Sequence, residues 1–343
     1  MSTSISAQEL PANARIMQML TGKWISASLS VVAELGIADL LAQGDKTALE
    51  LAAATSAHAS SLYRVLRALA SVGVFAETEG GRFTLTPLAE CLRSGVPNSM
   101  KEFARFVAMP GASRSWEQLL HCVKTGESGL RKAFGAANPF DYFKTHPEEA
   151  KIFDGAMTDN SRQSAPAVAE AYDFGAFRQI VDVAGGRGLL LATILKRFAN
   201  VNGVLFDLPA VIEGAKAALA SYGLDGRCQA VGGDFFQEVP SGADAYILKH
   251  IIHDWDDERA AAILRNIREA MDPSGRVLIV EVVIAPGNEP SFGKLLDLEM
   301  MVIPGGRERT GDEYRELLAA AGFRLAQIHP TYAPPSIIEG VPV

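Results

Sequence analysis

The sequence predicts a doubly wound α/β fold, in which a mostly parallel sheet follows a smaller helical domain. From Ala167 onward, short β-branched runs alternate with segments of helical spacing, a pattern typical of parallel sheets with helices on both faces. A glycine-rich turn at residues 184–188 joins the first of these runs to a helical segment. Before this region, apolar residues recur at helical spacing and only one hairpin is expected.

Residues 1–110 are predicted to form the helical domain. Residues 1 to about 12 have the character of a loose tail, and helical spacing then runs from Ala14 to Leu41, with a break at Gly36. The further elements expected are helices at Thr47–Ala54 and Ala59–Val72 and strands at Val74–Ala76 and Arg82–Leu85, joined through Glu79-Gly80-Gly81. Helices followed by a small hairpin describe a winged helix.

A winged helix raises the alternative of a DNA-binding or ligand-sensing regulator. Residues 1–110 contain nine basic and nine acidic side chains, and the whole chain has a net charge of −8. The helix expected at Ala59–Val72 would be the recognition helix, and its basic residues are Arg64 and Arg67. Recognition helices normally provide a stronger positive field. We therefore expect no nucleic-acid partner and favour a dimerisation or substrate-lid role for this domain.

Residues 111–165 are predicted to be a helical connector. Its helices, together with one just before it, are expected at Met100–Met109, Trp116–Lys124 and Pro147–Asn160. The segment is rich in aromatic residues, most of which are expected in the core, although some could line an apolar substrate pocket.

Composition limits the class of protein. Hydrophobic residues make up 48% of the 343 positions and charged residues 21%, which is typical of a globular protein with a sizeable core. Three widely spaced cysteines indicate a reducing compartment without a disulfide framework. No apolar run reaches membrane-spanning length, and no signal segment is recognised, so we expect a cytoplasmic protein without a membrane partner.

Residues 166–343 are predicted to form the α/β domain. Its strands are expected at Ile180–Val183, Val204–Phe206, Cys228–Val231, Ala245–Leu248, Arg276–Glu281, Phe323–His329 and Ser336–Val341. Thr310 followed by Glu313 forms a capping box, so a helix should begin there and run to Ala321.

The stretch from Ile180 to Gly188 predicts a nucleotide-type ligand, because a buried strand enters a helix through glycines. A dinucleotide motif would require a third glycine where Leu191 stands. Asp207 ends the next strand at the distance expected of a ribose-binding acid. Ala184 should keep an ordinary backbone geometry, because alanine adopts a positive φ only at a cost.

A second stretch, Lys249 to Glu258, follows the fourth strand and so reaches the same edge of the sheet. Asp256, Asp257 and Glu258 suit the first turn of the next helix, which explains them without a metal site. For His253, a catalytic and a structural role are both open at this point.

With these motifs in place, the chain resembles the plant-type small-molecule O-methyltransferases, which include caffeic acid, hydroxyindole and bacterial polyketide enzymes. Four motifs carry the resemblance, in the order and spacing of the family: Ile180–Gly188, Gly233–Phe236, Lys249–Glu258 and Pro304–Thr310. The domain in front matches as well. The resemblance implies a Rossmann-like methyltransferase sheet, an N-terminal dimerisation domain and S-adenosyl-L-methionine as the cofactor.

The resemblance also implies roles for individual residues. For the cofactor, Gly186 and Gly188 match the residues around its methionine part, Asp207 the residue at the ribose, Asp234 and Phe235 those at the adenine, and Lys249 the residue beside the adenine. Asp182, from the glycine motif, and Leu208 are also expected among the cofactor-binding residues. His253 matches the general base, followed by Asp254, and Glu281 and Glu308 match the glutamates that bracket and orient it. Asp297, Met300 and Met301 match the lining of the acceptor pocket.

The implied reaction is methylation of a hydroxyl group on a small aromatic, phenolic or polyketide-like substrate, without a metal. Relatives on this fold also include N-methyltransferases and a hydroxylase, and Ala184 does not decide among them. The N-terminal helix has more apolar residues than one stripe can bury, so we expect an intertwined homodimer.

Overall fold

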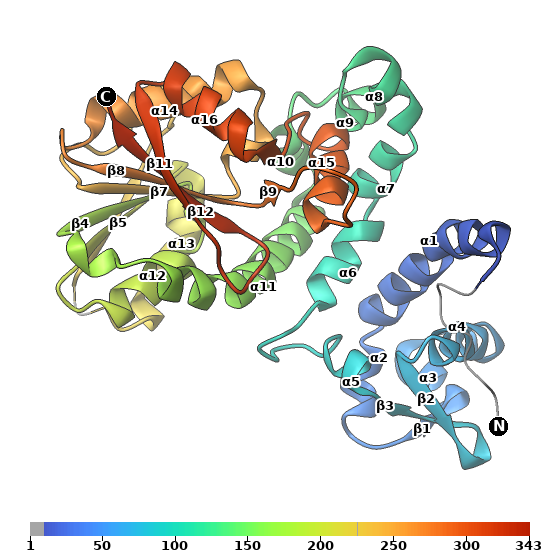
Figure 1. The fold of residues 1–343 in the computed structure, drawn as a ribbon. Coiled ribbons are helices and arrows are strands. Elements are labelled where there is room, and N and C mark those ends of the chain that lie inside the picture. The colour runs from blue at the N-terminus through green and yellow to red at the C-terminus, as the bar shows by residue number, and fades with distance from the viewer. Residues whose placement is uncertain (1–9, 225) are drawn as a thin grey trace. The chain divides into compact units, whose positions relative to one another are not determined.

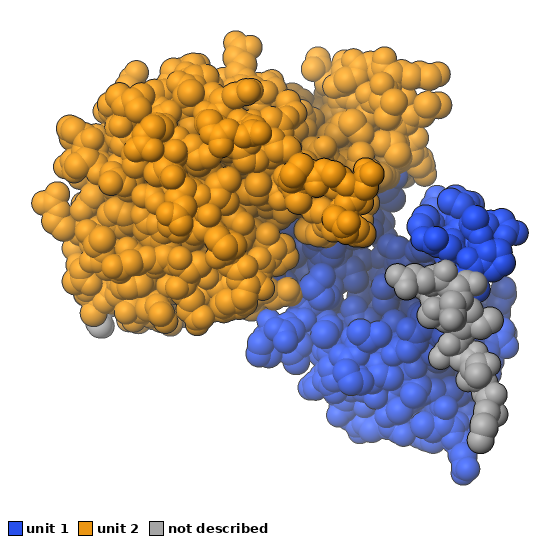
Figure 2. Space-filling model, viewed as in Figure 1, with its two compact units in different colours: residues 1–113, 146–159 blue, residues 114–145, 160–343 orange. Residues whose placement is uncertain are grey.

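The structure, a computed structural model, describes residues 10–224 and 226–343, so most of the predicted tail lies outside the described residues. It divides into two compact units, drawn in different colours in Figure 2. The first contains residues up to 113 together with 146–159, and the second contains 114–145 and 160–343. The residues of the predicted connector are thus divided between the two units. The domain limits at 110 and 165 stay a prediction.

The first unit has its helices and its hairpin where the sequence predicts them. The elements are α1 (Ala12–Glu34), α2 (Ile37–Leu41), α3 (Ala48–Thr55) and α4 (Ala59–Ser71), with a three-stranded antiparallel sheet of β1 (Lys46–Thr47), β3 (Arg82–Leu85) and β2 (Phe75–Thr78). Gly36 ends α1 with a φ of +63°, as its place in the pattern predicts. The winged-helix interpretation itself stays a prediction.

The helix α4 contributes its apolar face to the core of the first unit. Leu62, Leu66 and Leu69 are buried there, while Arg67 lies against the ring of Tyr63. This face is therefore used for packing.

The middle of the chain is more helical than the sequence predicts. The helices are α5 (Pro87–Glu90), α6 (Lys101–Ala108), α7 (Pro110–Trp116), α8 (Leu119–Thr125), α9 (Gly129–Phe134), α10 (Pro139–Thr145) and α11 (Pro147–Ala171). The predicted end of α11 at Asn160 is wrong, because the helix continues past Pro166. Packing of Ala165, Val168 and Ala169 against the sheet outweighs the backbone hydrogen bond that proline cannot make.

The second unit is built on a seven-stranded sheet with the order β11-β12-β8-β7-β4-β5-β6. Its strands are β4 (Gln179–Val183), β5 (Asn202–Asp207), β6 (Cys228–Gly232), β7 (Ala245–Lys249), β8 (Arg276–Glu281), β11 (Phe323–His329) and β12 (Ser336–Pro342). The five strands from β8 to β6 are parallel, and β12 and β11 extend the sheet in antiparallel pairing. The predicted mostly parallel sheet is confirmed.

Helices cover both faces of this sheet, which Figure 1 shows edge-on. On one face, α14 (Asp257–Ala270) and α16 (Gly311–Ala320) pack on alternate strand residues such as Val181 and Leu248. On the other, α11, α12 (Leu189–Arg197) and α13 (Pro209–Ser221) pack on residues such as Ile180 and Leu205. Outside this sheet lie α15 (Phe292–Val302) and the short parallel pair β9 (Val283–Ile284) and β10 (Arg309–Thr310).

The strand order brings the predicted motifs to one edge. The neighbouring strands β7, β4, β5 and β6 are parallel, so the residues that follow them meet at the carboxyl edge of the sheet. Ligands of open α/β sheets bind at such an edge.

The cytoplasmic location and the reducing compartment remain predictions. No described helix is long and apolar enough to cross a membrane. Cys91, Cys122 and Cys228 are free. The cytoplasmic location is not tested by either observation.

The packing of α4 predicts that Leu66→Ala destabilises the first unit by about 2–5 kcal/mol, because Leu66 is fully buried and cannot be replaced without a cavity. Leu49→Ala is the control, since Leu49 is 71% exposed and its loss should cost less than about 0.5 kcal/mol. Urea unfolding followed by circular dichroism measures both. Equal midpoints for the two variants would contradict this packing.

Candidate active site

The glycine turn after β4 shapes the first part of the site. A Cβ atom at Gly185 would lie 2.5 Å from the carboxyl group of Asp182, so only glycine fits there. Gly186 and Gly188 have φ values of +58° and +74°, and the space around Gly186 is open. The turn therefore leaves room beside the start of α12, where a ligand can approach the backbone.

The predicted ordinary backbone geometry of Ala184 is wrong. Its φ is +56°, in the left-handed region. Two hydrogen bonds hold the turn there, since the N–H groups of Ala184 and Gly185 donate to the carbonyl of Phe206 at 2.7 and 3.4 Å. A single left-handed alanine costs about 1–2 kcal/mol, which this bonding offsets.

The acidic residues after β5 and β6 lie at the same edge. The carboxylate of Asp207 accepts from the backbone N–H groups of Gly186 at 2.9 Å and Leu208 at 2.7 Å. Asp234 accepts from Phe236 N at 2.9 Å, and the ring of Phe235 lies 6.1 Å from that of Trp255, edge to face. Carboxylate oxygens accept hydrogen bonds, which is what the hydroxyl groups of a ribose require.

Asp182, which is buried, and Lys249, which is half-buried, are charged groups of this region that attract one another. Burial raises the pKa of Asp182 to about 7, against the attraction of Lys249. Burial also lowers the pKa of Lys249 to about 8, against the attraction of Asp182, and its Nζ atom donates to Ser161 Oγ at 3.1 Å. Both groups titrate close to neutral pH, which is typical of functional sites.

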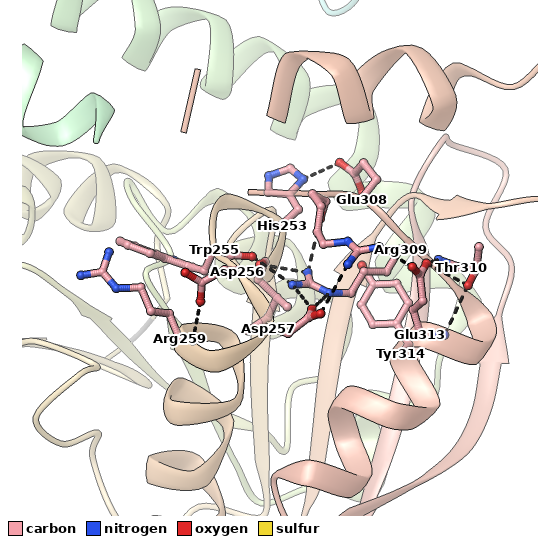
Figure 3. A network of polar contacts seen from close by, with 12 residues as sticks. His253, Trp255, Asp256, Asp257, Arg259, Glu308, Arg309, Thr310, Glu313 and Tyr314 are labelled. Atoms are coloured by element: carbon pink, nitrogen blue, oxygen red, sulfur yellow. Dashed lines mark hydrogen bonds and ion pairs between the residues drawn. The ribbon is translucent and has the colours of Figure 1, made fainter. Parts of the chain in front are cut away.

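His253 lies in a 3₁₀ turn, Ile252–Asp254, directly after β7. It is 6% exposed, and its Nδ1 atom shares a hydrogen bond of 2.6 Å with Oε1 of Glu308, as Figure 3 shows. The Nε2 atom lies 3.7 Å from Oδ1 of Asp254. Because Nδ1 is engaged, Nε2 is the nitrogen that remains for a substrate proton.

Glu281 supports the turn in a way that the sequence does not reveal. Its Oε1 accepts from the backbone N–H groups of Ile251 and His253, both at 3.1 Å, and its Oε2 accepts from the hydroxyl of Tyr314 at 2.5 Å. Glu281 therefore holds the backbone of His253, whereas Glu308 bonds to its ring.

The carboxylates around His253 determine its charge. Burial by itself lowers the pKa of the imidazole, but the hydrogen bond to Glu308 and the nearby Glu281 and Asp254 together raise it to about 9. Burial raises the pKa of Asp254 to about 6, against the attraction of His253. Burial raises the pKa of Glu308 as well, opposed by its bond to His253. These carboxylates therefore favour the imidazolium form of His253.

The same three side chains can be considered as metal ligands, because one ligand atom from each of His253, Glu281 and Glu308 lies within 4.8 Å of the others. The hydrogen bonds already described engage both oxygens of Glu281, one oxygen of Glu308 and Nδ1 of His253. This bonding explains the cluster without an ion, and a reaction without a metal stays a prediction.

The helix α15, which the sequence analysis did not predict, carries the remaining candidates. Asp297 accepts from the backbone N–H of Glu308 at 2.9 Å, so it holds the loop that carries Glu308. The carbonyl of Met300 accepts from Gly305 and Gly306, and Met301 is half-buried beside it. Leucines at 295 and 298, after Pro290 and Ser291, are the signal that could have predicted the helix.

His250 is a further residue of this region that the sequence analysis did not select. Its ring stacks on that of His253, with centroids 5.2 Å apart, and its backbone has a φ of +55°. Neither ring nitrogen has a hydrogen-bond partner among the described residues. Burial, and then the charges of Lys249 and His253, place the pKa of His250 well below its usual value, so the ring is neutral.

A parallel sheet with a glycine turn, two acidic loops and a lysine at one edge, next to a buried histidine bonded to a carboxylate, is typical of an enzyme that uses a nucleotide cofactor. The chain matches the model of the O-methyltransferase domain over residues 116–324 and that of the O-methyltransferase dimerisation domain over 17–95. It belongs to the S-adenosylmethionine-dependent O-methyltransferase family, as its motifs predict.

Similar proteins agree with this assignment. The phenazine O-methyltransferase PhzM of Lysobacter antibioticus is 47% identical over 345 residues, which cover 100% of both chains. The crystal structure of LaPhzM matches with a TM-score of 0.93 and 48% identity, over 97% of this chain and 100% of that one. NcsB1, an O-methyltransferase from neocarzinostatin biosynthesis solved with S-adenosylmethionine and 2-hydroxy-5-methyl naphthoic acid, matches with a TM-score of 0.80 and 33% identity, over 93% and 96%. Other matches include an N,N-dimethyltransferase and a hydroxylase.

The electrostatics of this site predict that Glu308→Gln lowers the pKa of His253 from about 9 by roughly 1–3 pH units, because the charged hydrogen-bond partner is lost. Glu299→Gln is the control, since Glu299 is a half-buried carboxylate that accepts from Trp116 and has no bond to His253. NMR titration of labelled histidine measures both variants. An unchanged titration in Glu308→Gln would show that Glu308 does not set the charge of the imidazole.

Proposed function

We propose that this enzyme methylates a hydroxyl group on a fused-ring aromatic compound, with His253 as the general base. The observation that carries the proposal is the buried bond between His253 Nδ1 and Glu308 Oε1, at the sheet edge where the cofactor loops end. The names of the relatives support the substrate class, because PhzM is a phenazine O-methyltransferase and NcsB1 was solved with a naphthoic acid.

The residues of the sheet edge fit the parts of S-adenosylmethionine. Gly186 and Gly188 would hold the methionine part in the open space of the turn, while Asp207 and Leu208 would hold the ribose. Asp234 would accept from the adenine amino group and Phe235 would cover the ring, with Asp182 and Lys249 closing the inner side. When bound, the cofactor supplies a methyl group on a positively charged sulfonium.

His253 would take the hydroxyl proton at Nε2. A phenol near pKa 10 and an ordinary histidine near 6.5 differ by about 3.5 pH units, or roughly 5 kcal/mol. The carboxylates around His253 raise its pKa to about 9, which narrows the gap to about 1 pH unit, or roughly 1.4 kcal/mol. Glu308 and Asp254 then stabilise the imidazolium that forms.

The raised pKa of His253 also makes turnover depend on pH. With a pKa of about 9, the neutral form that can accept a proton increases as the pH rises toward 9. We expect turnover to rise with pH along the titration of His253. The positive sulfonium of a bound cofactor beside His253 would lower that pKa and so shift the rise to lower pH.

The acceptor would lie against α15. Met300 and Met301 offer flexible apolar contacts, which suit a planar aromatic ring. Asp297 would act on the acceptor indirectly, since its carboxylate holds the backbone of Glu308.

Two other reactions use the same cofactor and fold, N-methylation and hydroxylation, and relatives carry both names. A neutral amine attacks a methyl group without first losing a proton, so it has less need of a base than a phenol. The carboxylate-supported histidine therefore favours O-methylation. A regulator that senses ligands through a winged helix is less favoured, because residues 1–110 carry no excess positive charge.

We also propose that the enzyme is a homodimer that pairs through α1. Large apolar side chains on this helix are exposed in the single chain, among them Met19 at 69%, Leu20 at 65% and Trp24 at 70%. The match to the dimerisation domain supports this, and such an apolar surface normally marks an interface.

The role of the base predicts that His253→Gln lowers turnover by roughly 10²- to 10⁴-fold on a phenol of ordinary pKa, because no group remains to accept the proton. The loss should shrink for phenols that are already ionised at neutral pH. Released S-adenosylhomocysteine measures turnover over a panel of aromatic acceptors, and calorimetry with S-adenosylmethionine should show unchanged affinity. Near-normal turnover in the variant would refute His253 as the base.

The exposed face of α1 predicts that Leu20→Glu weakens the dimer, because a charge would be buried in an apolar interface. Light scattering at micromolar concentration should show a dimer for the wild type and a larger monomer fraction for the variant. Leu49→Glu, on an exposed position of α3, is the matched control. A wild-type monomer with full activity would overturn the proposal.

A further inference from the structure

The turn that carries His253 is in direct contact with the loop at residues 306–309. The backbone N–H of Arg307 donates to the carbonyl of His253 at 2.8 Å. A Cβ atom at Gly306 would overlap that same carbonyl, so the two backbones touch. The loop therefore contacts the base twice, once through its backbone and once through the side chain of Glu308.

Arg309, the next residue, is fully buried and lies at the centre of the network in Figure 3. Each nitrogen of its guanidinium group has at least one acceptor. The partners are Asp257 Oδ1 for Nε at 2.9 Å and Nη2 at 2.8 Å, the carbonyls of Ile252 and Arg307 for Nη1 at 3.2 and 3.3 Å, and the carbonyl of Trp255 for Nη2 at 2.9 Å.

Two of these acceptors flank the reacting residue. Ile252 immediately precedes His253 in the turn, and Trp255 immediately follows Asp254. A guanidinium group is planar and presents its donors in a rigid fork, so it fixes both carbonyls relative to its own backbone. That backbone is continuous with Glu308, whose carboxylate must reach Nδ1 of His253.

We infer that Arg309 is a positioning residue, which holds the turn of His253 in register with Glu308. The inference rests on the proposed function, because this register matters to the chemistry only if His253 is the base. The groups facing the imidazole are Glu308, Asp254, Glu281 and the stacked ring of His250, and all except Glu308 come from the β7–turn segment or from β8.

Stability alone does not explain a buried arginine here. Its ion-pair partner, Asp257, is 59% exposed, so solvent screens the pair and the pair contributes little to stability. The bonds to the turn are what an apolar side chain cannot make. Lysine keeps the charge, but its three rotatable donors cannot reproduce the fork.

Arg307 provides a matched control. It forms an ion pair with the same Asp257 at 3.4 Å and another with Glu313, but its side chain is 44% exposed. Among the described residues, its side chain has no hydrogen bond to the turn at 252–255. A comparison of Arg309→Lys with Arg307→Lys therefore separates the hold on the turn from the charge next to Asp257.

The test measures three quantities in the full-length protein: the pKa of His253 by NMR, turnover on a phenolic acceptor, and the affinity for S-adenosylmethionine by calorimetry. In Arg309→Lys, we expect turnover to fall roughly 10- to 100-fold, because the base is misplaced. The pKa of His253 should fall toward about 6.5 as the bond to Glu308 loosens, while the cofactor affinity stays within about twofold. Arg307→Lys should leave all three at wild-type values.

Several results would overturn the inference. The first is a variant Arg309→Lys in which both the pKa of His253 and the turnover keep their wild-type values. The second is a variant with a lower melting temperature and lower turnover but an unchanged pKa of His253, which would mean that Arg309 has a structural role only. If Arg309→Lys does not fold, Asp257→Ala decides, because it removes the side-chain acceptor of Nε and Nη2 at a position that is 59% exposed. A fall in the pKa of His253 in that variant supports the inference, and no change overturns it. The pKa of His253 is measured independently of turnover, so near-normal turnover in His253→Gln would refute only the proposed function.

Discussion

The hydrogen bond between His253 and Glu308 is the interaction on which the site depends. Each partner is buried, and either one left alone would be an uncompensated charge that costs several kcal/mol. The two residues are 55 positions apart in the chain and come from different elements. The edge of the sheet places one of them and α15 holds the loop of the other through Asp297, so the bond forms only in the complete second unit.

The charges around this bond make the histidine a stronger base than it is in solution. Three carboxylates surround one imidazole, while the neighbouring ring of His250 stays neutral and adds no opposing charge. The cost of assembling this much negative charge is met by backbone N–H groups and the hydroxyl of Tyr314, which satisfy Glu281. Strongly acidic surroundings of this kind also suit a positively charged cofactor.

Local patterns predicted much of this structure, and long-range contacts account for what they missed. The break at Gly36, the strand before the glycine turn and the capping box at Thr310 depend on neighbours in sequence, and all three are present. The left-handed Ala184 depends on the carbonyl of Phe206, 22 positions away, and Arg309 donates to the carbonyls of Ile252 and Trp255 in a turn 54–57 positions before it. Such contacts leave no trace in local spacing.

The short parallel pair of β9 and β10 sets limits on the length of the chain. In its register Arg309 pairs with Val283. Arg309 is the residue after Glu308, and Val283 is the second residue after Glu281. A slip of this register by one residue in either direction would bring an arginine, Arg307 or Arg309, to the place of Glu308, and the imidazole would then face a cation. The exposed residues 285–290 lie outside this register, so insertions there leave His253 and Glu308 in place.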